Sequence, residues 1–228
     1  MGHEVPVDAE GRFLLGLGRD APAAVTVTVV REDGAREQET IRVARRDYDI
    51  QRIDGLDRNQ VSPDAATLER IRRDAAAVRS ARSERLAARH FDAGWIWPLT
   101  GPVSGVFGSQ RILNGEPRQP HYGIDIARPT GTPVRAPSDG VVTLVAEDLF
   151  FSGGTLILDH GQGLSSSFLH LSAMRVARGD RVRQGEIIAE VGATGRVTGP
   201  HLDWRMNWFD QRIDPSMLVP PMQEARNE

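Results

Sequence analysis

Polar and apolar side chains alternate strictly along one stretch near the C-terminus. The polar positions are His201, Asp203, Arg205 and Asn207, and the apolar positions are Leu202, Trp204, Met206 and Trp208. Such alternation predicts a half-buried β-strand, whose apolar face packs in a core and holds the polar face in a fixed direction. The Cα atoms of His201 and Asp203 would lie about 7 Å apart, close enough for both side chains to bind one metal ion or one substrate group. The alternative is a solvated strand face without a ligand.

A second polar cluster lies earlier in the chain, where His121 is followed four positions later by Asp125. A straight strand would separate their Cα atoms by about 13 Å, but Gly123 between them allows the backbone to bend or bulge. With that bend, His121, Asp125 and Asp203 form a set of one imidazole and two carboxylates. Such a set leaves a coordination position open for water, as a catalytic zinc site requires. A lone histidine, His170, lies between the two clusters.

The composition excludes several other kinds of site. The 228 residues contain neither cysteine nor lysine, so disulfides, thiolate nucleophiles and lysine-based chemistry are excluded, and any metal must be held by nitrogen and oxygen atoms. The net charge is only -3 and the charges are interspersed, which argues against nucleic acid or an anionic membrane as the main partner. No apolar run approaches the roughly 20 residues that a transmembrane helix needs.

The elements that must position these residues fall into four segments. We expect a small β accessory module over 1–55, a connector and arginine-rich helix over 56–94, a β-domain over 95–215 and a polar tail over 216–228. In the first segment, alternating strands flank a hairpin turn at Asp33-Gly34. The fold class is therefore mainly β.

The helix is predicted to begin at Ser62-Pro63 and to run to about Arg89, because apolar residues recur there at helical spacing. Its arginines allow two interpretations. They form a solvated face on a helix that packs by a narrow apolar stripe, or they bind an acidic partner.

Short β-branched runs and glycine-rich turns begin at Trp95 and predict a compact antiparallel β-domain. One of these turns is Gly161-Gln162-Gly163, and the adjacent His160 is expected to be a turn residue.

Three motifs in this domain occur in the order found in a known family. They are Phe107 to Gly131 with His121-x-x-x-Asp125 inside it, Phe168-Leu169-His170-Leu171-Ser172, and Thr198-Gly199-Pro200-His201-Leu202. Over about residues 95–215 the chain resembles the M23 or LytM-type zinc metallopeptidases, which cut peptidoglycan cross-bridges. Residues 176–195 also resemble half of a barrel-sandwich of the lipoyl carrier type, a fold that the peptidase family partly shares. A carrier would need a lysine, which the chain lacks.

The resemblance implies zinc as the cofactor and a role for each motif residue. It makes His121 and Asp125 the first two zinc ligands. In the family, the third ligand is the second histidine of a His-x-His pair, and that pair reads His201-Leu202-Asp203 here, so Asp203 takes the ligand position. The resemblance also implies that His170 and His201 are the catalytic acid–base pair.

Arg205 leaves the state of the metal site open. It lies two residues after Asp203 on the same predicted strand face, where a charge-assisted hydrogen bond would make the carboxylate a poorer ligand. Three alternatives follow: a zinc site with Asp203 as a ligand, a weak site with two ligands, or no physiological metal.

The function implied by the resemblance is a zinc-dependent endopeptidase that hydrolyses peptide cross-links of bacterial peptidoglycan. Asn114, Arg111 and Tyr122 lie beside the first cluster and are candidates for lining a substrate groove, or else they are polar loop residues at the surface. We expect export to the periplasm or cell envelope, with the export signal removed from this chain. The alternative function is a catalytically impaired LytM-like domain that binds peptidoglycan or regulates another cell-wall hydrolase.

Overall fold

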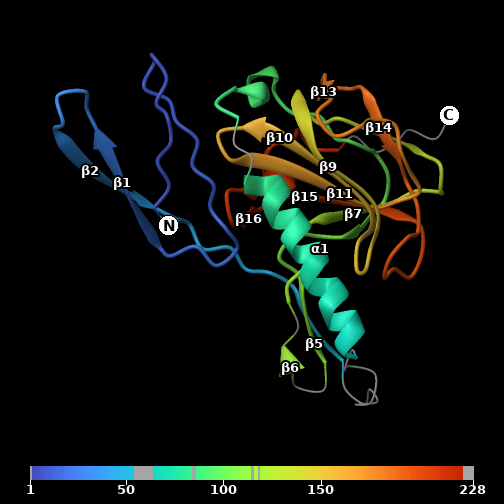
Figure 1. The fold of residues 1–228 in the computed structure, drawn as a ribbon. Helices are drawn as coiled ribbons and strands as arrows, with labels where there is room; N and C mark the ends of the chain where they lie inside the picture. The colour runs from blue at the N-terminus through green and yellow to red at the C-terminus, as the bar shows by residue number, and fades with distance from the viewer. Residues whose placement is uncertain (1, 54–63, 84–85, 114–115, 118, 223–228) are drawn as a thin grey trace.

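The computed structural model describes residues 2–53, 64–83, 86–113, 116–117 and 119–222 (Figure 1). Within these ranges strands predominate, and α1 (Ala65–Ser83) is the one α-helix. The predicted class is confirmed: a mainly β fold with antiparallel sheets, preceded by a small β-module and one long helix. None of the described helices combines the length and the apolar character that crossing a membrane requires.

A large antiparallel sheet forms the body of the protein. It has eight strands, ordered β13 (Arg181–Val182), β9 (Gly140–Leu149), β10 (Gly153–Gly161), β11 (Leu164–Leu171), β15 (His201–Trp208), β7 (Ile124–Ala127) and β4 (Val103–Gly105), with β16 (Gln211–Ile213) paired to β15. A second sheet has the order β12 (Ala173–Met174), β14 (Ile187–Glu190) and β8 (Pro133–Arg135). Side chains from both sheets, among them Leu156, Phe168 and Ile188, share one buried apolar cluster. This core fixes the strands that carry the polar motifs.

The stretch of alternating polarity forms β15, as predicted. Leu202, Trp204 and Met206 on its apolar face are fully buried. The opposite face is more enclosed than that of a half-solvated strand, since Asp203 and Asn207 are each 2% exposed. The polar face of β15 is therefore buried at Asp203 and Asn207 and half-buried at His201 and Arg205.

Helix α1 lies across the outer face of the large sheet (Figure 1), and its residues Val78 and Arg82 come close to Arg205 of β15. Near its N-terminal end, Arg70 donates a hydrogen bond to Asp148 of β9 at 2.7 Å. Near its C-terminal end, Arg82 donates to the Ser167 hydroxyl of β11 at 2.9 Å. The helix is thus tied to the sheet at both ends and lies over the strands between them.

The ends of α1 differ from the prediction. The expected start at Ser62-Pro63 lies outside the described residues, and Asp64 accepts a hydrogen bond from the Thr67 amide at 2.7 Å, as an N-cap does. The helix ends at Ser83 instead of continuing to about Arg89. Beyond the helix, the Leu86 carbonyl accepts a hydrogen bond from the Gln162 amide of the β10–β11 hairpin at 2.8 Å. That docking takes the chain out of the helical path.

The N-terminal region forms the predicted hairpin. β1 (Ala24–Val30) pairs with β2 (Arg36–Arg42), and Gly34 in the turn has a φ of 82°, a conformation that glycine adopts without strain. β3 (Ile50–Ile53) instead pairs in parallel with β5 (Gln110–Leu113), which pairs with β6 (Glu116–Pro117). Strand pairing therefore joins the end of the N-terminal segment to residues beyond 95. Two short 3-10 helices, η2 (His90–Ala93) and η3 (Pro215–Met217), complete the elements of the described residues.

His160 is not the turn residue that its neighbours suggested. It is the penultimate residue of β10 and is completely buried, with Nδ1 2.6 Å from the Asp139 carbonyl oxygen and Nε2 2.7 Å from the Ser166 hydroxyl. The carbonyl accepts the Nδ1 proton, so the neutral ring satisfies both contacts. Burial lowers the pKa of His160 to about 4.

This burial predicts an acid-sensitive fold. The unfolded chain binds a proton at His160 near pH 6.5 and the folded chain only near pH 4, so the free energy of unfolding falls as the pH drops between these values. We expect this residue to account for a loss of about 3 kcal/mol by pH 4. Urea unfolding of the wild type and of His160→Gln, carried out between pH 6.5 and pH 4, measures this loss of stability. The variant keeps a hydrogen-bond donor and an acceptor but cannot gain a proton. If the free energy of unfolding of the two proteins falls in parallel with pH, His160 is not the cause of the acid sensitivity.

Candidate metal centre

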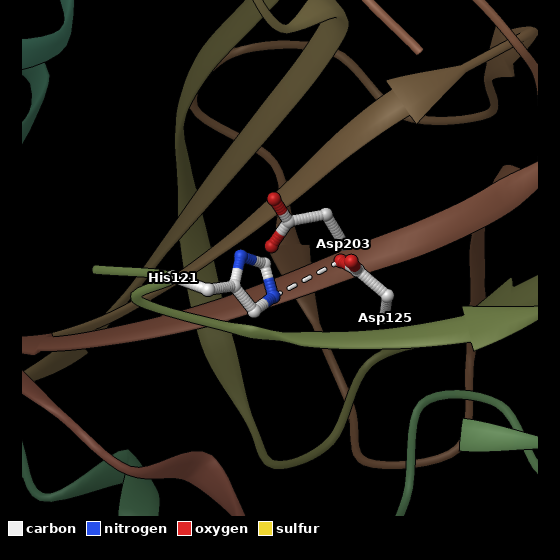
Figure 2. A group of neighbouring side chains, drawn as sticks. All are labelled: His121, Asp125 and Asp203. Carbon is white, nitrogen blue, oxygen red and sulfur yellow. Dashed lines mark ion pairs between the residues drawn. The ribbon is translucent and has the colours of Figure 1, made fainter. Parts of the chain in front are cut away.

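Three side chains predicted to share a site converge at one point (Figure 2). His121, Asp125 and Asp203 each offer a ligand atom, and these atoms all lie within 4.8 Å of one another. Asp125 on β7 is the direct antiparallel partner of Asp203 on β15. His121 lies just before β7, and its amide and carbonyl are bonded to Ser109 and Gly108, so the chain bends before the strand begins. The bend expected at Gly123 therefore brings the imidazole back toward the two carboxylates.

Two glycines make this close approach possible. A Cβ atom at Gly123 would overlap the Oδ1 atom of Asp203, and one at Gly105 would overlap the Oδ2 atom of Asp125. The backbones of β4 and of the segment before β7 thus pack directly against the carboxylates. Any larger residue at either position would displace a proposed ligand.

The ion pair expected between Asp203 and Arg205 is present. Nε of Arg205 lies 3.0 Å from Oδ1 and 2.9 Å from Oδ2 of Asp203, and Nη2 lies 2.5 Å from Oδ2. Burial acts to raise the pKa of Asp203, but the charge and hydrogen bonds of Arg205 outweigh it and hold that pKa below its usual value. Asp203 is therefore a buried carboxylate ion with one built-in cationic partner.

The remaining ligand atoms fit a divalent cation. His121 Nε2 and Asp125 Oδ1 face each other at 3.2 Å, and both atoms are buried without a hydrogen-bond partner in the described part of the chain. Buried polar atoms are normally satisfied, so this pair of unsatisfied atoms points to a ligand between them. Each carboxylate oxygen has two lone pairs, and Asp203 Oδ1 accepts only one bond from Arg205. One imidazole nitrogen and carboxylate oxygens are suitable donors for zinc.

Two further histidines face this cluster. The rings of His170 and His201 are 4.9 Å apart at their centroids, and His201 Nε2 lies 3.8 Å from Asp125 Oδ1. The Nδ1 atom of each ring lies 2.9 Å from a backbone carbonyl oxygen, that of Thr194 for His170 and that of Gly199 for His201. A carbonyl accepts the Nδ1 proton, so in the neutral rings Nε2 is the atom free to take up a proton.

His170 is held in an unusual backbone conformation. Its φ is 65°, which is rare for a residue with a side chain. It follows Leu169 at a bulge in β11, where the register against β10 shifts between the pairs Gly154–Leu171 and Leu156–Phe168. Such a conformation costs on the order of 1–3 kcal/mol and is typical of functional sites. Burial lowers the pKa of His170, which favours its neutral form.

The residues expected to line a substrate groove are described in part. Tyr122 is half-buried, with its ring centroid 6.1 Å from that of Phe107 and 6.0 Å from the Arg212 guanidinium. Arg111 lies in β5, and Asn114 lies outside the described residues.

Sequence reasoning missed a cavity of about 280 Å³ beside His170. Arg82, Arg205 and Arg212 line it together with Arg196. The alternation of β15 already placed Arg205 on the correct face. No local pattern distinguishes Arg82 from the other arginines of its helix, because its burial depends on where α1 crosses the sheet.

Comparisons with known proteins agree with this geometry. The profile of peptidase family M23 matches residues 119–215. A crystal structure of a Pseudomonas aeruginosa protein assigned to peptidase M23 is 32% identical in sequence, with a TM-score of 0.73, and the match covers 94% of this chain and 82% of that one.

Two curated relatives match shorter stretches. The DD-carboxypeptidase/endopeptidase Mpg of Neisseria meningitidis serogroup B is 42% identical over 104 residues, which are 46% of this chain and 24% of that protein. The peptidoglycan DD-endopeptidase ShyA of Vibrio cholerae is 41% identical over 87 residues, which are 38% of this chain and 20% of that protein. The matched region thus spans about a quarter or less of these relatives.

Proposed function

This chain belongs to peptidase family M23, and from that premise we propose that it is a zinc-dependent endopeptidase that hydrolyses peptide cross-links of bacterial peptidoglycan. The observation that carries the proposal is the meeting of His121, Asp125 and Asp203 at one point beside two imidazoles. The names of the curated relatives, which are peptidoglycan DD-endopeptidases and a DD-carboxypeptidase/endopeptidase, support the substrate class. They favour a hydrolase over a catalytically impaired domain that only binds or regulates.

His121, Asp125 and Asp203 would hold the zinc ion. When bound, zinc supplies a Lewis acid that polarises the amide carbonyl and lowers the pKa of water. The buried Nε2 of His121 and Oδ1 of Asp125 need no rearrangement to act as ligands, since neither forms a hydrogen bond with the described residues. Arg205 fixes the rotamer of Asp203 and offsets its charge.

His170 and His201 would transfer the protons of the hydrolysis. One ring takes a proton from the attacking water at its Nε2 atom, and a proton then passes from one of the two rings to the leaving amine nitrogen. The carbonyls of Thr194 and Gly199 hold both rings in the tautomer that this requires. Burial lowers the pKa of His170, which favours the neutral ring that can accept the proton of water.

The proposal assigns catalysis to residues 95–215, the accessory roles to 1–55 and 56–94, and no catalytic part to the tail at 216–228. Tyr122, with Arg111 and Asn114, would line the substrate groove beside the metal ligands. Export to the cell envelope follows from the substrate, because peptidoglycan lies outside the cytoplasmic membrane.

Metal removal tests the function directly. We expect purified protein to contain near-stoichiometric zinc by elemental analysis and to release products from cross-linked muropeptides. Activity should disappear with a chelator and return when zinc is added, because the cluster depends on the ion to activate water. Metal-free protein that binds sacculi without releasing fragments would overturn the proposal in favour of the binding or regulatory alternative.

A further inference from the structure

An arginine-lined cavity lies beside His170, between α1 and the outer face of the large sheet. Its volume is about 280 Å³. Four arginines from separate elements line it: Arg82 of α1, Arg196 of the loop before β15, Arg205 of β15 and Arg212 of β16. We call this the arginine pocket. His170 forms part of the same wall, so the pocket opens directly onto a proposed proton-transfer group.

Most of the positive charge in the arginine pocket has no acidic partner. Among the residues that the structure describes, Arg205 alone of the four is paired with a carboxylate, that of Asp203. Arg82 donates one bond to the Ser167 hydroxyl, and its buried Nε atom has no acceptor in the described part of the chain. Arg212 donates to the neutral Asn207 side chain at 3.2 Å. The guanidiniums of Arg82 and Arg212 are half-buried and have few acceptors among the described residues, and an anion in the pocket would supply them.

The charges of these side chains also act on one another. Burial, followed by the positive charges of Arg212 and Arg205, lowers the pKa of Arg82 to about 9. Burial and Arg205 likewise lower the pKa of Arg212. Both pKa shifts mean that the pocket destabilises the protonated guanidiniums of Arg82 and Arg212. An anion between them would relieve that repulsion.

We propose that the arginine pocket binds a carboxylate group of the peptide substrate, next to the amide bond that is cleaved. This rests on the proposed function, since the anionic groups of a peptide are carboxylates. Guanidinium groups bind carboxylates through paired, charge-assisted hydrogen bonds. The shared position of His170 places that carboxylate on the side of the site where protons are transferred. The pocket thereby selects peptides with a free carboxylate near the scissile bond.

Amidation of the substrate tests this selection. We compare two cross-linked muropeptides that differ only in whether the carboxylate nearest the scissile bond is free or amidated. For the wild type we expect kcat/KM to fall by at least about 10-fold on amidation, because charge-assisted hydrogen bonds are lost. In Arg82→Gln this preference should fall toward unity. The matched control is Arg79→Gln, an exposed arginine on the same helix, which should retain the full preference.

The outcomes separate the pocket from the catalytic proposal. Equal rates for both substrates with the wild type would overturn the carboxylate pocket while leaving the hydrolase intact, and this arm holds even if the Arg82 variant fails to fold. If neither substrate is cleaved, calorimetry with N-acetyl-D-alanyl-D-alanine and its C-terminal amide decides the pocket alone. Preferential binding of the free acid, reduced in Arg82→Gln, would support it. Binding of inorganic phosphate without binding of the free acid would overturn it.

Discussion

Replacement of His170 by alanine is expected to lower kcat by a factor of about 10² to 10⁴ without changing the zinc content. The residue supplies no ligand atom to the cluster of His121, Asp125 and Asp203, but its ring lies 4.9 Å from that of His201. Its Nδ1 atom is already engaged with the Thr194 carbonyl, so the loss of the ring removes an Nε2 atom placed to exchange protons. Initial-rate assays on cross-linked muropeptides measure kcat, and elemental analysis of the same preparations measures the zinc content.

The stability of variants at position 170 separates the backbone strain from the catalytic role of the side chain. A φ of 65° is less strained for glycine than for alanine, so His170→Gly should fold at least as stably as His170→Ala while remaining equally inactive. His90→Ala is the matched control, because His90 lies in η2 and lines neither the metal cluster nor the cavity. Near-wild-type activity of His170→Ala would remove His170 from the catalytic machinery.

The sequence was most informative where a short-range pattern decided the structure. The alternation from His201 to Trp208 requires an apolar face, and the fully buried Trp204 occupies it. The same alternation placed Asp203 and Arg205 on one face, where the ion pair then formed. Glycine between His121 and Asp125 indicated a bend, because a backbone without a Cβ atom can pass close to a carboxylate.

The features that escaped prediction depend on how separate strands and helices pack against one another. The conformation of His170 arises from the register of β10 against β11, which no run of residues in β11 specifies by itself. Arg82 resembles the other arginines of α1 until the helix is laid over Ser167 and the arginine pocket. His160 is next to a glycine-rich turn in the sequence, yet the Asp139 carbonyl and Ser166 enclose it. Local pattern thus indicated the candidate ligands, whereas tertiary packing determined their surroundings.

Arg205→Met is expected to destabilise the metal-free protein by about 3–5 kcal/mol, because it leaves a buried carboxylate without its cationic partner. Asp203 is 2% exposed, and the Arg205 guanidinium makes three hydrogen-bond contacts to its carboxylate. Zinc bound by His121, Asp125 and Asp203 would replace the missing positive charge. We therefore expect stoichiometric zinc to recover most of the loss, so that zinc stabilises this variant more than it stabilises the wild type.

Urea unfolding with a chelator and with stoichiometric zinc, in the wild type and in Arg205→Met, gives the four free energies that this comparison needs. The double variant Asp203→Asn/Arg205→Met is the matched control. It removes the buried charge together with its partner, so its metal-free loss should be smaller than that of Arg205→Met, and zinc should recover less of it. If zinc leaves the Arg205→Met deficit unchanged, the bound ion does not contact Asp203 and the site consists of His121 and Asp125 alone. If zinc restores the stability of Arg205→Met, the carboxylate of Asp203 binds the metal and, in the wild type, also Arg205. Asp203 would then be a metal ligand at the position where the family has histidine.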